Sequence, residues 1–513
     1  MSSSIKRKFF KNTAIVSVFT MLSRIFGYIR DAAIFIFISN STGALDAFFV
    51  AFRIPNFFRR IFGEGALSTA YIPVLSDYKN NKEREDVKEF IDTSISSLTF
   101  ILIIISAIGV LIAPLLIYLI APGFINSEFG QSELSSSLLR ITFPYMLFIC
   151  LTAVVASILN TYDNFTVPAF TPVLLNISLI LSAIYLSQFL DNPVMALAWG
   201  VLIGGILQLT FQIPFLRKIK KLPKLQFGHH KSLDILKKRM LPALFGVSVS
   251  QINLLVDTMI ASTLIAGSVS WLYYSDRLLE LPLALIGIAL ATVALAKLSN
   301  YHALKDTENF IKTINKALLI ALILGLPACL GLILYSKELI ITLFQYGEFS
   351  INSAIKTSLS LQAYGSGLMA FIAVKIFAPI FLSRGDTKTP VKAGVVAMVS
   401  NIILNLILVQ FYGHIGLAAA TSISALLNAS ILYFYLIKQS IFKFDAALYK
   451  MLTKVIFAVI VMSSYIIFFD TNIEVYIDST LIDRCRFLFK SIVISASIYF
   501  LSLYIIGVRY KHI

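Results

Sequence analysis

Long apolar stretches recur along the whole chain, and short polar segments separate them. Each stretch is about 20 residues long, which is enough to cross a hydrocarbon core of roughly 30 Å as an α-helix. The stretches are continuous rather than alternating, so they favour helices over the strands of a β-barrel. A helix also satisfies its own backbone hydrogen bonds in lipid. The pattern predicts an all-α integral membrane protein with about fourteen spans. The predicted spans are 13–39, 46–77, 90–120, 136–160, 168–188, 193–216, 238–266, 271–296, 310–336, 357–383, 390–411, 414–437, 448–469 and 487–508.

The composition agrees with this pattern, because 58% of the 513 residues are hydrophobic and only 14% are charged. Soluble proteins average about 25% charged residues. The net charge of +16 does not indicate a nucleic-acid partner, since the basic residues gather in short loops between the spans. With the N-terminus inside, the inner segments hold roughly 29 of the 43 Lys and Arg residues and the outer segments roughly six. This asymmetry predicts that both termini are cytoplasmic.

Cysteine and histidine usage does not indicate a disulfide framework or a metal site. Cys150 and Cys329 lie in apolar spans and Cys485 lies near a span end, so all three fit packing roles. The five histidines form no metal-binding motif. The first apolar stretch carries charged residues and no cleavage pattern, which indicates a first span rather than a signal peptide. We expect no organic cofactor.

The chain repeats itself at an offset of 223 residues. Leu75-Ser76-Asp77-Tyr78 ends the second predicted span, and Leu298-Ser299-Asn300-Tyr301 ends the eighth. At the same offset, residues 66–69 resemble residues 289–292. We infer two homologous six-helix lobes, with a binding site expected between them, as in other transporters built from repeats. The predicted divisions are an N-terminal lobe at 1–216, a basic linker at 217–237, a C-terminal lobe at 238–437 and two added helices at 438–513.

Charged residues inside the predicted spans are costly, and they usually mark a pathway, a binding site or an ion pair. About eight cations fall in this group: Arg24, Arg30, Arg53, Arg59, Arg60, Arg277, Lys316 and Lys375. They outnumber the acids beside them. Arginine suits phosphate because its planar fork donates two hydrogen bonds at once. The excess of cations therefore indicates a phosphate-bearing substrate.

Ion pairs along or between helices are the alternative explanation for these charges. Arg60 and Glu64 stand at i,i+4, and Arg277 and Glu280 stand at i,i+3. Lys316 lies near the start of a span, where a long side chain extends to the membrane surface. Such pairs would stabilise the helices without binding a ligand.

The first predicted span shows the same ambiguity. Arg24 and Asp31 are seven residues apart and share one helix face. Arg30 points elsewhere unless the helix bends near Gly27. The sequence leaves open whether these side chains pair with each other or face a substrate.

A second group of polar residues contains no basic partner. Asp257 lies in the seventh predicted span, Asn401 and Asn405 stand at i,i+4 in the eleventh, and Thr421 lies in the twelfth. Converging oxygen ligands can hold a hard cation such as Na⁺. The alternative is that Asn and Thr form hydrogen bonds between helices.

Four motifs resemble those of one known family. They are SRIFGYIRDA at 23–32, DAFFVAFRIPNFFRRIFGEGA at 46–66, YSDRLLELP at 274–282 and SRGDTKTPVK at 383–392. The second motif is long and specific. On these residues the chain resembles the MurJ/MviN family of lipid II flippases from about residue 13 to its end.

The resemblance implies the fold of the multidrug/oligosaccharidyl-lipid/polysaccharide exporter superfamily, with two lobes around a cationic cavity. The family's cavity arginines, which bind the lipid II diphosphate and headgroup, match Arg24, Arg30, Arg59 and Arg277. Further charged residues expected to support this cavity are Asp31, Asp46, Arg53, Arg60, Glu64, Asp276, Glu280 and Lys375. The family's cation site matches Asp257, Asn401, Asn405, Leu417 (through its carbonyl) and Thr421. The last two helices would form a groove for the polyprenyl tail.

The sequence departs from the family pattern at two places. Ala296 and Lys297 precede Leu298-Ser299 where the family usually has a proline, so the end of the eighth span is expected to be straighter. Asn405 stands where the cation site often has an acid, which removes one negative charge from the predicted Na⁺ site.

We therefore expect a monomeric inner-membrane transporter that moves lipid II between leaflets by alternating access and makes or breaks no bond. Coupling to Na⁺ or to the membrane potential is an expectation as well, since one charge moved across 100 mV is worth about 2.3 kcal/mol. An exporter of drugs or of another polyprenyl-diphosphate-linked glycan is the alternative within the same fold. A membrane glycosyltransferase would need a catalytic carboxylate and large outer loops, and the predicted outer loops are short.

Overall fold

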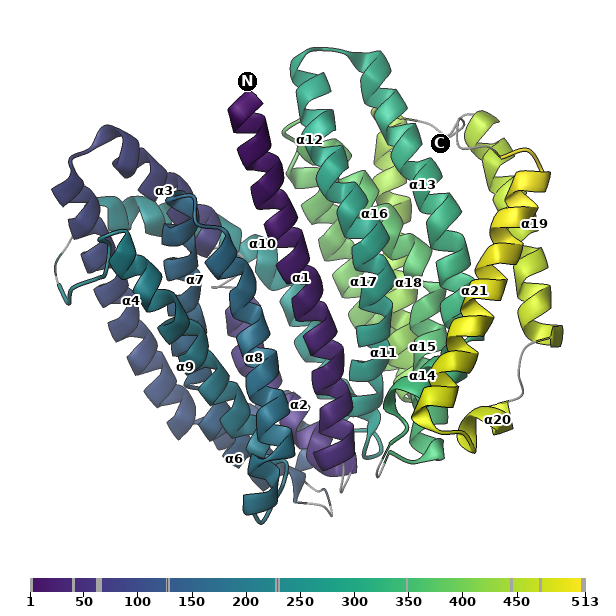
Figure 1. The fold of residues 1–513 in the computed structure, drawn as a ribbon, viewed down its shortest axis with the longest axis horizontal. Helices are drawn as coiled ribbons and strands as arrows, with labels where there is room; N and C mark the ends of the chain where they lie inside the picture. The colour runs from purple at the N-terminus through teal and green to yellow at the C-terminus, as the bar shows by residue number, and fades with distance from the viewer. Residues whose placement is uncertain are drawn as a thin grey trace. The chain divides into compact units, whose positions relative to one another are not determined.

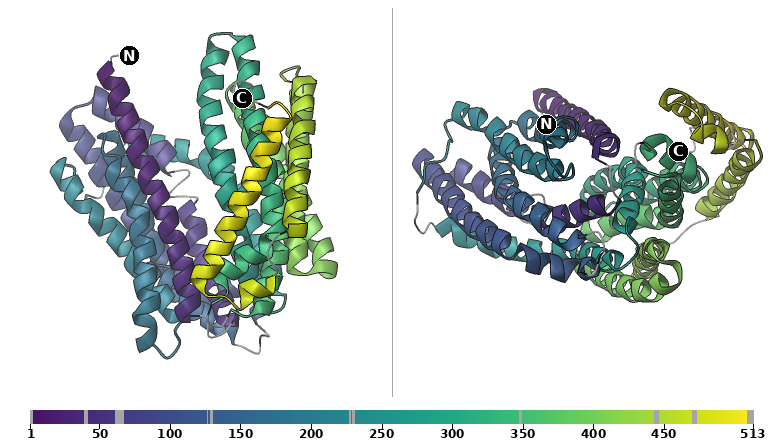
Figure 2. Two further views of the ribbon diagram at one scale, coloured as in Figure 1. Left: turned by 45° about the vertical axis from the view of Figure 1, so that its right-hand side comes forward. Right: turned by 90° about the horizontal axis from the view of Figure 1, so that it is seen from below.

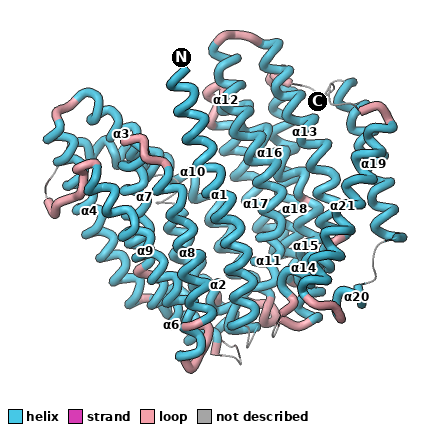
Figure 3. The backbone as a smooth tube through the Cα atoms, viewed as in Figure 1, coloured by secondary structure: helices cyan, strands magenta, loops and turns pink. Residues whose placement is uncertain are grey.

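The computed structural model describes residues 3–38, 42–60, 67–125, 127, 130–226, 228, 231–346, 349–442, 446–469 and 473–508. Within these ranges the chain forms helices joined by short loops and contains no β-strand (Figure 3). Eleven helices in the same ranges are long and apolar enough to cross a membrane. The predicted all-α membrane fold is confirmed.

Three predicted spans fall on helices outside this set of eleven. Spans 13–39 and 238–266 correspond to α1 (Ser3–Ile38) and α10 (Lys231–Ser262). Span 46–77 is divided between α2 (Thr42–Phe58) and α3 (Leu67–Asn81), each of which contains a proline that removes a backbone donor. The structure is consistent with fourteen spans, and the exact count stays a prediction.

The chain divides into two compact units, the first of which comprises Met1–Gly267 with Tyr346–Glu348. Helix α1 packs along α8, as Figures 1 and 2 show, and α10 packs on α3. Helix α10 thus belongs to the first unit by its packing, whereas the repeat assigns its span to the second lobe; the predicted lobe boundaries stay predictions. The other helices of this unit are α4 (Arg84–Leu111), α5 (Ala113–Ile120), η2 (Pro122–Phe124), α6 (Gln131–Thr142), α7 (Tyr145–Thr161), α8 (Thr166–Ile184), η3 (Leu186–Phe189) and α9 (Met195–Lys218).

The second unit comprises Ser268–Gln345 with Phe349–Ile513. Its helices are α11 (Ser268–Pro282), the π-helix η4 (Leu283–Ile288), α12 (Ala289–Ala303), α13 (Thr307–Leu334), α14 (Ser336–Phe344), α15 (Ile351–Ser366), α16 (Leu368–Leu382), α17 (Lys388–Tyr412), α18 (His414–Lys438), α19 (Ala446–Phe469), α20 (Ile473–Ile477) and α21 (Leu481–Ile505). Helices α17 and α18 pack closely on each other, and α18 packs on α15 and α16.

The two units share helix starts and turns at corresponding positions. Helices α4 and α13 each have 28 residues, and they begin at Arg84 and Thr307, which are 223 positions apart. The turns after α9 and α18 also match, because Lys220 and Ser440 both adopt the left-handed conformation, with φ of 57° and 52°. In each turn the next amide closes a hydrogen bond to a helical carbonyl five residues earlier, as in a Schellman motif. The predicted internal repeat is therefore present in the backbone.

The last two long helices pack on α13 of the second unit, at the yellow end of the chain in Figure 1. The Tyr499 hydroxyl of α21 donates to the Ile323 carbonyl at 2.7 Å. Tyr335, at the end of α13, lies 2.6 Å from the Ser495 hydroxyl. Large apolar side chains such as Ile460 and Phe489 are exposed on α19 and α21, as expected of surfaces that face lipid. The predicted groove for a polyprenyl tail stays a prediction.

Candidate functional site

Helix α1 carries Arg30 in a buried setting, with only 11% of its side chain exposed. Its Nε donates to Oδ1 of Asp31 at 2.9 Å, and its Nη1 donates to Oδ1 of Asn176 on α8 at 3.2 Å. Asn176 in turn donates to the Ser23 carbonyl at 3.0 Å. The sequence leaves Arg30 pointing away from Asp31 unless the helix bends near Gly27, and in the structure the long arginine side chain reaches the neighbouring carboxylate.

This arrangement gives Arg30 a defined orientation. Asp31 is 1% exposed and offsets the arginine charge, so part of the predicted excess of cations is neutralised inside the first unit. Asn176 connects two turns of α1 through its amide. Nothing in the sequence of α8 distinguishes Asn176 except its isolation in an apolar stretch. Arg24 is half-buried on the same helix, one residue after Ser23.

Helix α2 positions a second group of arginines. Arg53 donates to the Leu254 carbonyl of α10 at 3.1 Å. Beyond α2 the helix continues in a π-helical turn at Arg59 and Arg60, both half-buried, and such turns recur at functional sites. The Nε of Arg59 donates to Oδ1 of Asn56 at 2.8 Å, so a side chain of the same helix orients the guanidinium. Glu64, the predicted i,i+4 partner of Arg60, lies outside the described residues.

Asp46 takes a different place from the one the sequence suggests. The predicted second span begins at Asp46, whereas α2 begins at Thr42 and leaves Asp46 only 1% exposed. Its Oδ2 accepts the backbone N–H of Gly267 at 2.6 Å, where the chain has a φ of 99°. A buried carboxylate needs such donors. Asp46 therefore fixes a backbone turn of the first unit.

In the second unit, α11 carries Arg277. Its Nη1 lies 3.7 Å from Oε2 of Glu280, so the predicted i,i+3 pair is present. The side chains are 27% and 44% exposed, and a pair of this length and exposure contributes little stability. Asp276 is half-buried beside Arg277, and Lys375 is exposed on α16.

The predicted cavity arginines thus divide between the units. Arg24, Arg30 and Arg59 belong to the first unit and Arg277 to the second. The two that have the clearest partners are oriented by short polar side chains, Asp31 and Asn56. Convergence of the four arginines on one diphosphate stays a prediction.

The structure brings together four of the five residues of the predicted cation site. Asn401 and Asn405 are fully buried on α17, and Asn405 Nδ2 donates to Asn401 Oδ1 at 3.1 Å. Asn401 Nδ2 reaches Thr421 Oγ1 on α18 at 3.4 Å, and Thr421 donates to the Leu417 carbonyl at 3.0 Å. Asp257, half-buried on α10, belongs to the first unit.

This chain of hydrogen bonds agrees with the helix-packing alternative. The oxygens are of the type that Na⁺ prefers. Here, however, Asn401 Oδ1 already accepts a hydrogen bond from Asn405, and the Leu417 carbonyl accepts one from Thr421. Each of these carbonyl oxygens keeps a second lone pair, so the hydrogen bonds do not by themselves exclude a cation. Across the described part of the chain, no group of three or more His, Cys, Asp or Glu residues could hold a metal ion.

Arg484 is a buried arginine that the sequence assigns to an outer loop. It begins the second turn of α21, and only 7% of the residue is exposed. Its guanidinium donates to backbone oxygens at the ends of α14 and α20. The acceptors are the carbonyls of Tyr476 at 2.6 Å, Ile477 at 2.8 Å, Gln345 at 3.1 Å and Ile341 at 3.4 Å. Loop position alone could not predict this burial, because the acceptors come from distant segments.

The architecture of two helical units is one that membrane transporters share. The fold is similar to that of an inward-facing multidrug resistance MATE family transporter of the MOP superfamily, with a TM-score of 0.70 and 16% identity over 85% of this chain and 99% of that one. A closer likeness is to a structure of the lipid II flippase MurJ in an inward closed conformation. It has a TM-score of 0.79 and 30% identity over 96% of this chain and all of that one.

Sequence comparisons define the family. The family model for the lipid II flippase MurJ matches residues 36–484. A probable lipid II flippase MurJ of Vibrio cholerae is 41% identical over 99% of this chain and 98% of its own length. The lipid II flippase MurJ of Burkholderia cenocepacia is 34% identical over 98% of each chain. The chain belongs to the lipid II flippase MurJ family, and the predicted resemblance is confirmed. Family and fold together make it a multi-pass protein of the bacterial inner membrane.

Proposed function

We propose that this chain translocates lipid II, the lipid-linked precursor of peptidoglycan, from the cytoplasmic to the periplasmic leaflet by alternating access. It is a transporter and not an enzyme, because a flippase changes the position of its substrate and no bond. The observation that carries the proposal is the set of oriented arginines on α1 and α2 in a chain whose relatives are lipid II flippases. Arg24, Arg30, Arg59 and Arg277 are the residues proposed to bind the diphosphate.

The chemistry of the substrate explains why arginine is used. A diphosphate brings negative charge into a low-dielectric bundle, where each unpaired anion is costly. A guanidinium donates two parallel hydrogen bonds to one phosphate group, which adds geometry to charge. Asn56 and Asp31 already restrict the side chains of Arg59 and Arg30. Restricted side chains lose less rotamer entropy when they bind, so less affinity is lost.

The proposed topology places both termini in the cytoplasm, because the inner segments hold most of the basic residues. In a chain whose exposed Cys485 is replaced by serine, a cysteine introduced at position 44 should react with an impermeant thiol reagent from outside intact cells, and one at position 226 should not. Labelling at 226 in intact cells would reverse the orientation. Monomeric action, coupling to Na⁺ through the Asp257, Asn401, Asn405, Leu417 and Thr421 group, and coupling to the membrane potential belong to this proposal as well.

Translocation by the purified chain tests the proposal directly. The protein is reconstituted into vesicles that contain labelled lipid II, and the fraction accessible to an external reagent is followed with time. We expect transport of lipid II and none of a polyprenyl glycan that lacks the diphosphate. Replacing Lys316, an exposed span-end cation outside the proposed site, by alanine should leave the rate unchanged. Equal transport of both lipids, or of neither by an intact protein, would refute the proposal.

A further inference from the structure

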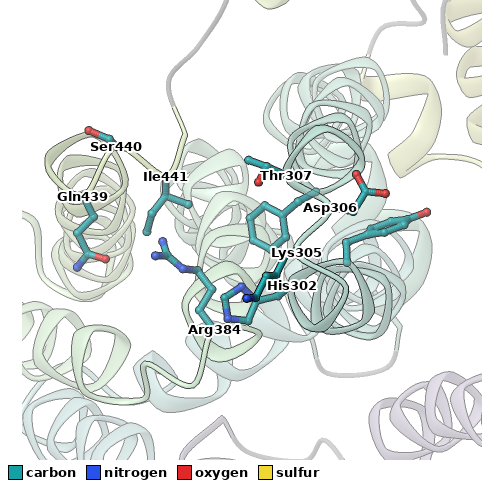
Figure 4. A pocket seen from close by; sticks show the side chains of 10 residues that line it. His302, Lys305, Asp306, Thr307, Arg384, Gln439, Ser440 and Ile441 are labelled. Carbon is teal, nitrogen blue, oxygen red and sulfur yellow. The ribbon is translucent and has the colours of Figure 1, made fainter.

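A pocket lies at one end of the second unit, where three loops meet. The loops join α12 to α13, α16 to α17, and α18 to α19, and the pocket has a volume of about 310 Å³. Its lining includes the basic side chains of His302, Lys305 and Arg384, the carboxylate of Asp306 and the hydroxyl of Ser440. Figure 4 shows Arg384 extending from its loop toward the turn at Ser440, with His302 beside it in this view. None of these residues belongs to the arginine set or to the Asn401 cluster.

The acids on the same loops are engaged elsewhere. Asp306 caps α13 by accepting the backbone N–H of Asn309 at 3.1 Å and its side-chain amide at 2.7 Å. Asp386 caps α17 and accepts the Thr389 hydroxyl at 2.6 Å. These hydrogen bonds, above all those from the side chains of Asn309 and Thr389, lower the pKa of both carboxyls. Both acids are therefore held as helix caps rather than as partners of the pocket cations.

Asp386 lies near enough to Arg384 for their charges to interact, but among the described residues the two form no ion pair. Over the described ranges, the side chains of His302, Lys305 and Arg384 make no hydrogen bond or ion pair. His302 makes only a ring contact, with its centroid 6.4 Å from that of the buried Phe310. The pocket therefore presents several donors that could bind an anion. They are a guanidinium, an ammonium, an imidazole and the Ser440 hydroxyl.

The first unit shows that the fold does not require this arrangement. The repeat offset of 223 places Lys79 at the position of His302, and the matched turns after α7 and α16 place Tyr162 at that of Arg384. Lys79 donates to the Thr161 carbonyl at 2.7 Å and lies 4.6 Å over the ring of Tyr162. The first unit thus uses its cation to bind its own turn. In the second unit the turn after α16 carries Arg384, whose side chain lines the pocket.

We propose that this pocket binds a phosphate group through His302, Lys305 and Arg384, as a lipid headgroup phosphodiester or as a soluble phosphate ester. Phosphate fits this donor set better than a lone carboxylate, since its oxygens can accept from several directions while arginine supplies a bidentate pair. On the proposed topology the pocket opens to the cytoplasm, beside the membrane surface. The site is separate from the lipid II arginines and does not depend on translocation.

Phosphate binding to the full chain in nanodiscs of neutral lipid tests this site. Titration with inorganic phosphate at low salt should show one saturable site in the wild type. His302→Ala/Arg384→Ala should weaken it about tenfold or more. Arg384→Lys keeps the charge but loses the fork and should fall between them. Lys388→Ala removes an exposed cation of the same loop that does not line the pocket, and should change affinity less than about twofold.

The two sources of phosphate are separated by repeating the titration in nanodiscs that contain phosphatidylglycerol. If the lipid headgroup occupies the pocket, the anionic lipid abolishes phosphate binding in the wild type. If the natural ligand is a soluble ester, phosphate binding persists. Both results support the site. Equal affinity in the wild type and the double variant would overturn it, and so would an equal loss in Lys388→Ala, which would indicate general surface charge. Unchanged thermal unfolding of each variant confirms that the fold is intact.

Discussion

Arg484 and Arg59 are both arginines near helix ends, and they are held in opposite ways. The guanidinium of Arg484 donates to four backbone carbonyls from two helices. Arg59 is held through its Nε by Asn56, a side chain three residues earlier. Backbone acceptors are permanent parts of the fold, and a ligand cannot replace them without unwinding helix ends. A side-chain partner orients an arginine for a further ligand.

Arg30 stands between these two cases. It is more buried than Arg277, and its main partner is the carboxylate of Asp31. An adjacent acid can neutralise an arginine for stability, or it can hold the arginine in place for a phosphate. Burial and distance are the same in both roles, and substitution of the arginine with and without the acid separates them.

The largest effect is expected at the proposed diphosphate arginines. Arg24→Ala, Arg59→Ala and Arg277→Ala should each lower lipid II translocation by roughly 30-fold or more, because losing a buried charged hydrogen-bond partner costs about 2–5 kcal/mol. Arg→Lys should impair at least one of these positions, since lysine lacks the fork. The checks are the vesicle assay and complementation of a depletion strain, run beside membrane abundance. Normal activity of all three alanine variants would assign them no role in binding.

The Arg30 and Asp31 pair should show the next largest effect. Arg30→Ala leaves a buried carboxylate without its partner, and breaking a buried pair costs about 3–5 kcal/mol. If the pair is structural, membrane abundance falls and Arg30→Ala/Asp31→Ala restores it. If Arg30 binds the diphosphate, the double variant recovers abundance without transport. Immunoblots and the flipping assay together separate the two results.

Arg484 should affect stability without a direct effect on transport. Arg484→Met removes the guanidinium from four carbonyls, of which Ile341 and Tyr476 keep a backbone donor. We expect a loss of about 2–3 kcal/mol in the free energy of unfolding. The matched control is Arg486→Met, whose side chain is 74% exposed and pairs only loosely with Asp483. Its loss should stay under about 1 kcal/mol. Thermal unfolding in detergent measures both, and equal losses would contradict the structural role of Arg484.

The smallest effect is expected at the amide cluster. Asn401→Leu removes the amide that reaches Thr421 on α18, and interhelical hydrogen bonds in membranes average about 0.6 kcal/mol. If the cluster only joins α17 to α18, transport is unchanged at every Na⁺ concentration in this variant and in Asp257→Ala. A Na⁺ dependence that disappears in both variants would instead establish the cation site.

The fold could be predicted because helix formation in lipid is a local requirement. Each apolar stretch satisfies its own backbone, so continuous hydrophobicity of the right length gives the helices. The Arg277 and Glu280 pair was likewise predictable, since i,i+3 spacing brings two side chains together on any helix.

Long-range partners could not be predicted in this way. The acceptors of Arg484 at Ile341 and Gln345 lie about 140 positions away along the chain, and Asn176 lies 146 positions from Arg30. No local period encodes these contacts. The pocket around Arg384 needs three loops to meet, and the motif at 383–392 is visible in the sequence while its surroundings are not. Spacing on a helix predicts a face, and packing decides what that face meets.

The paired turns have a consequence for how such a chain can diverge after duplication. The turn after α7 places Asp163 at φ 63°, and its counterpart after α16 places Gly385 at φ 79°. In both turns the following amide returns to a helical carbonyl, from Asn164 to Leu159 and from Asp386 to Phe381. Each copy inherited the path of the chain and then changed the side chains on it independently. In a duplicated membrane protein the backbone of a turn can thus be the same in both copies, while the side chains on that turn make different contacts in each.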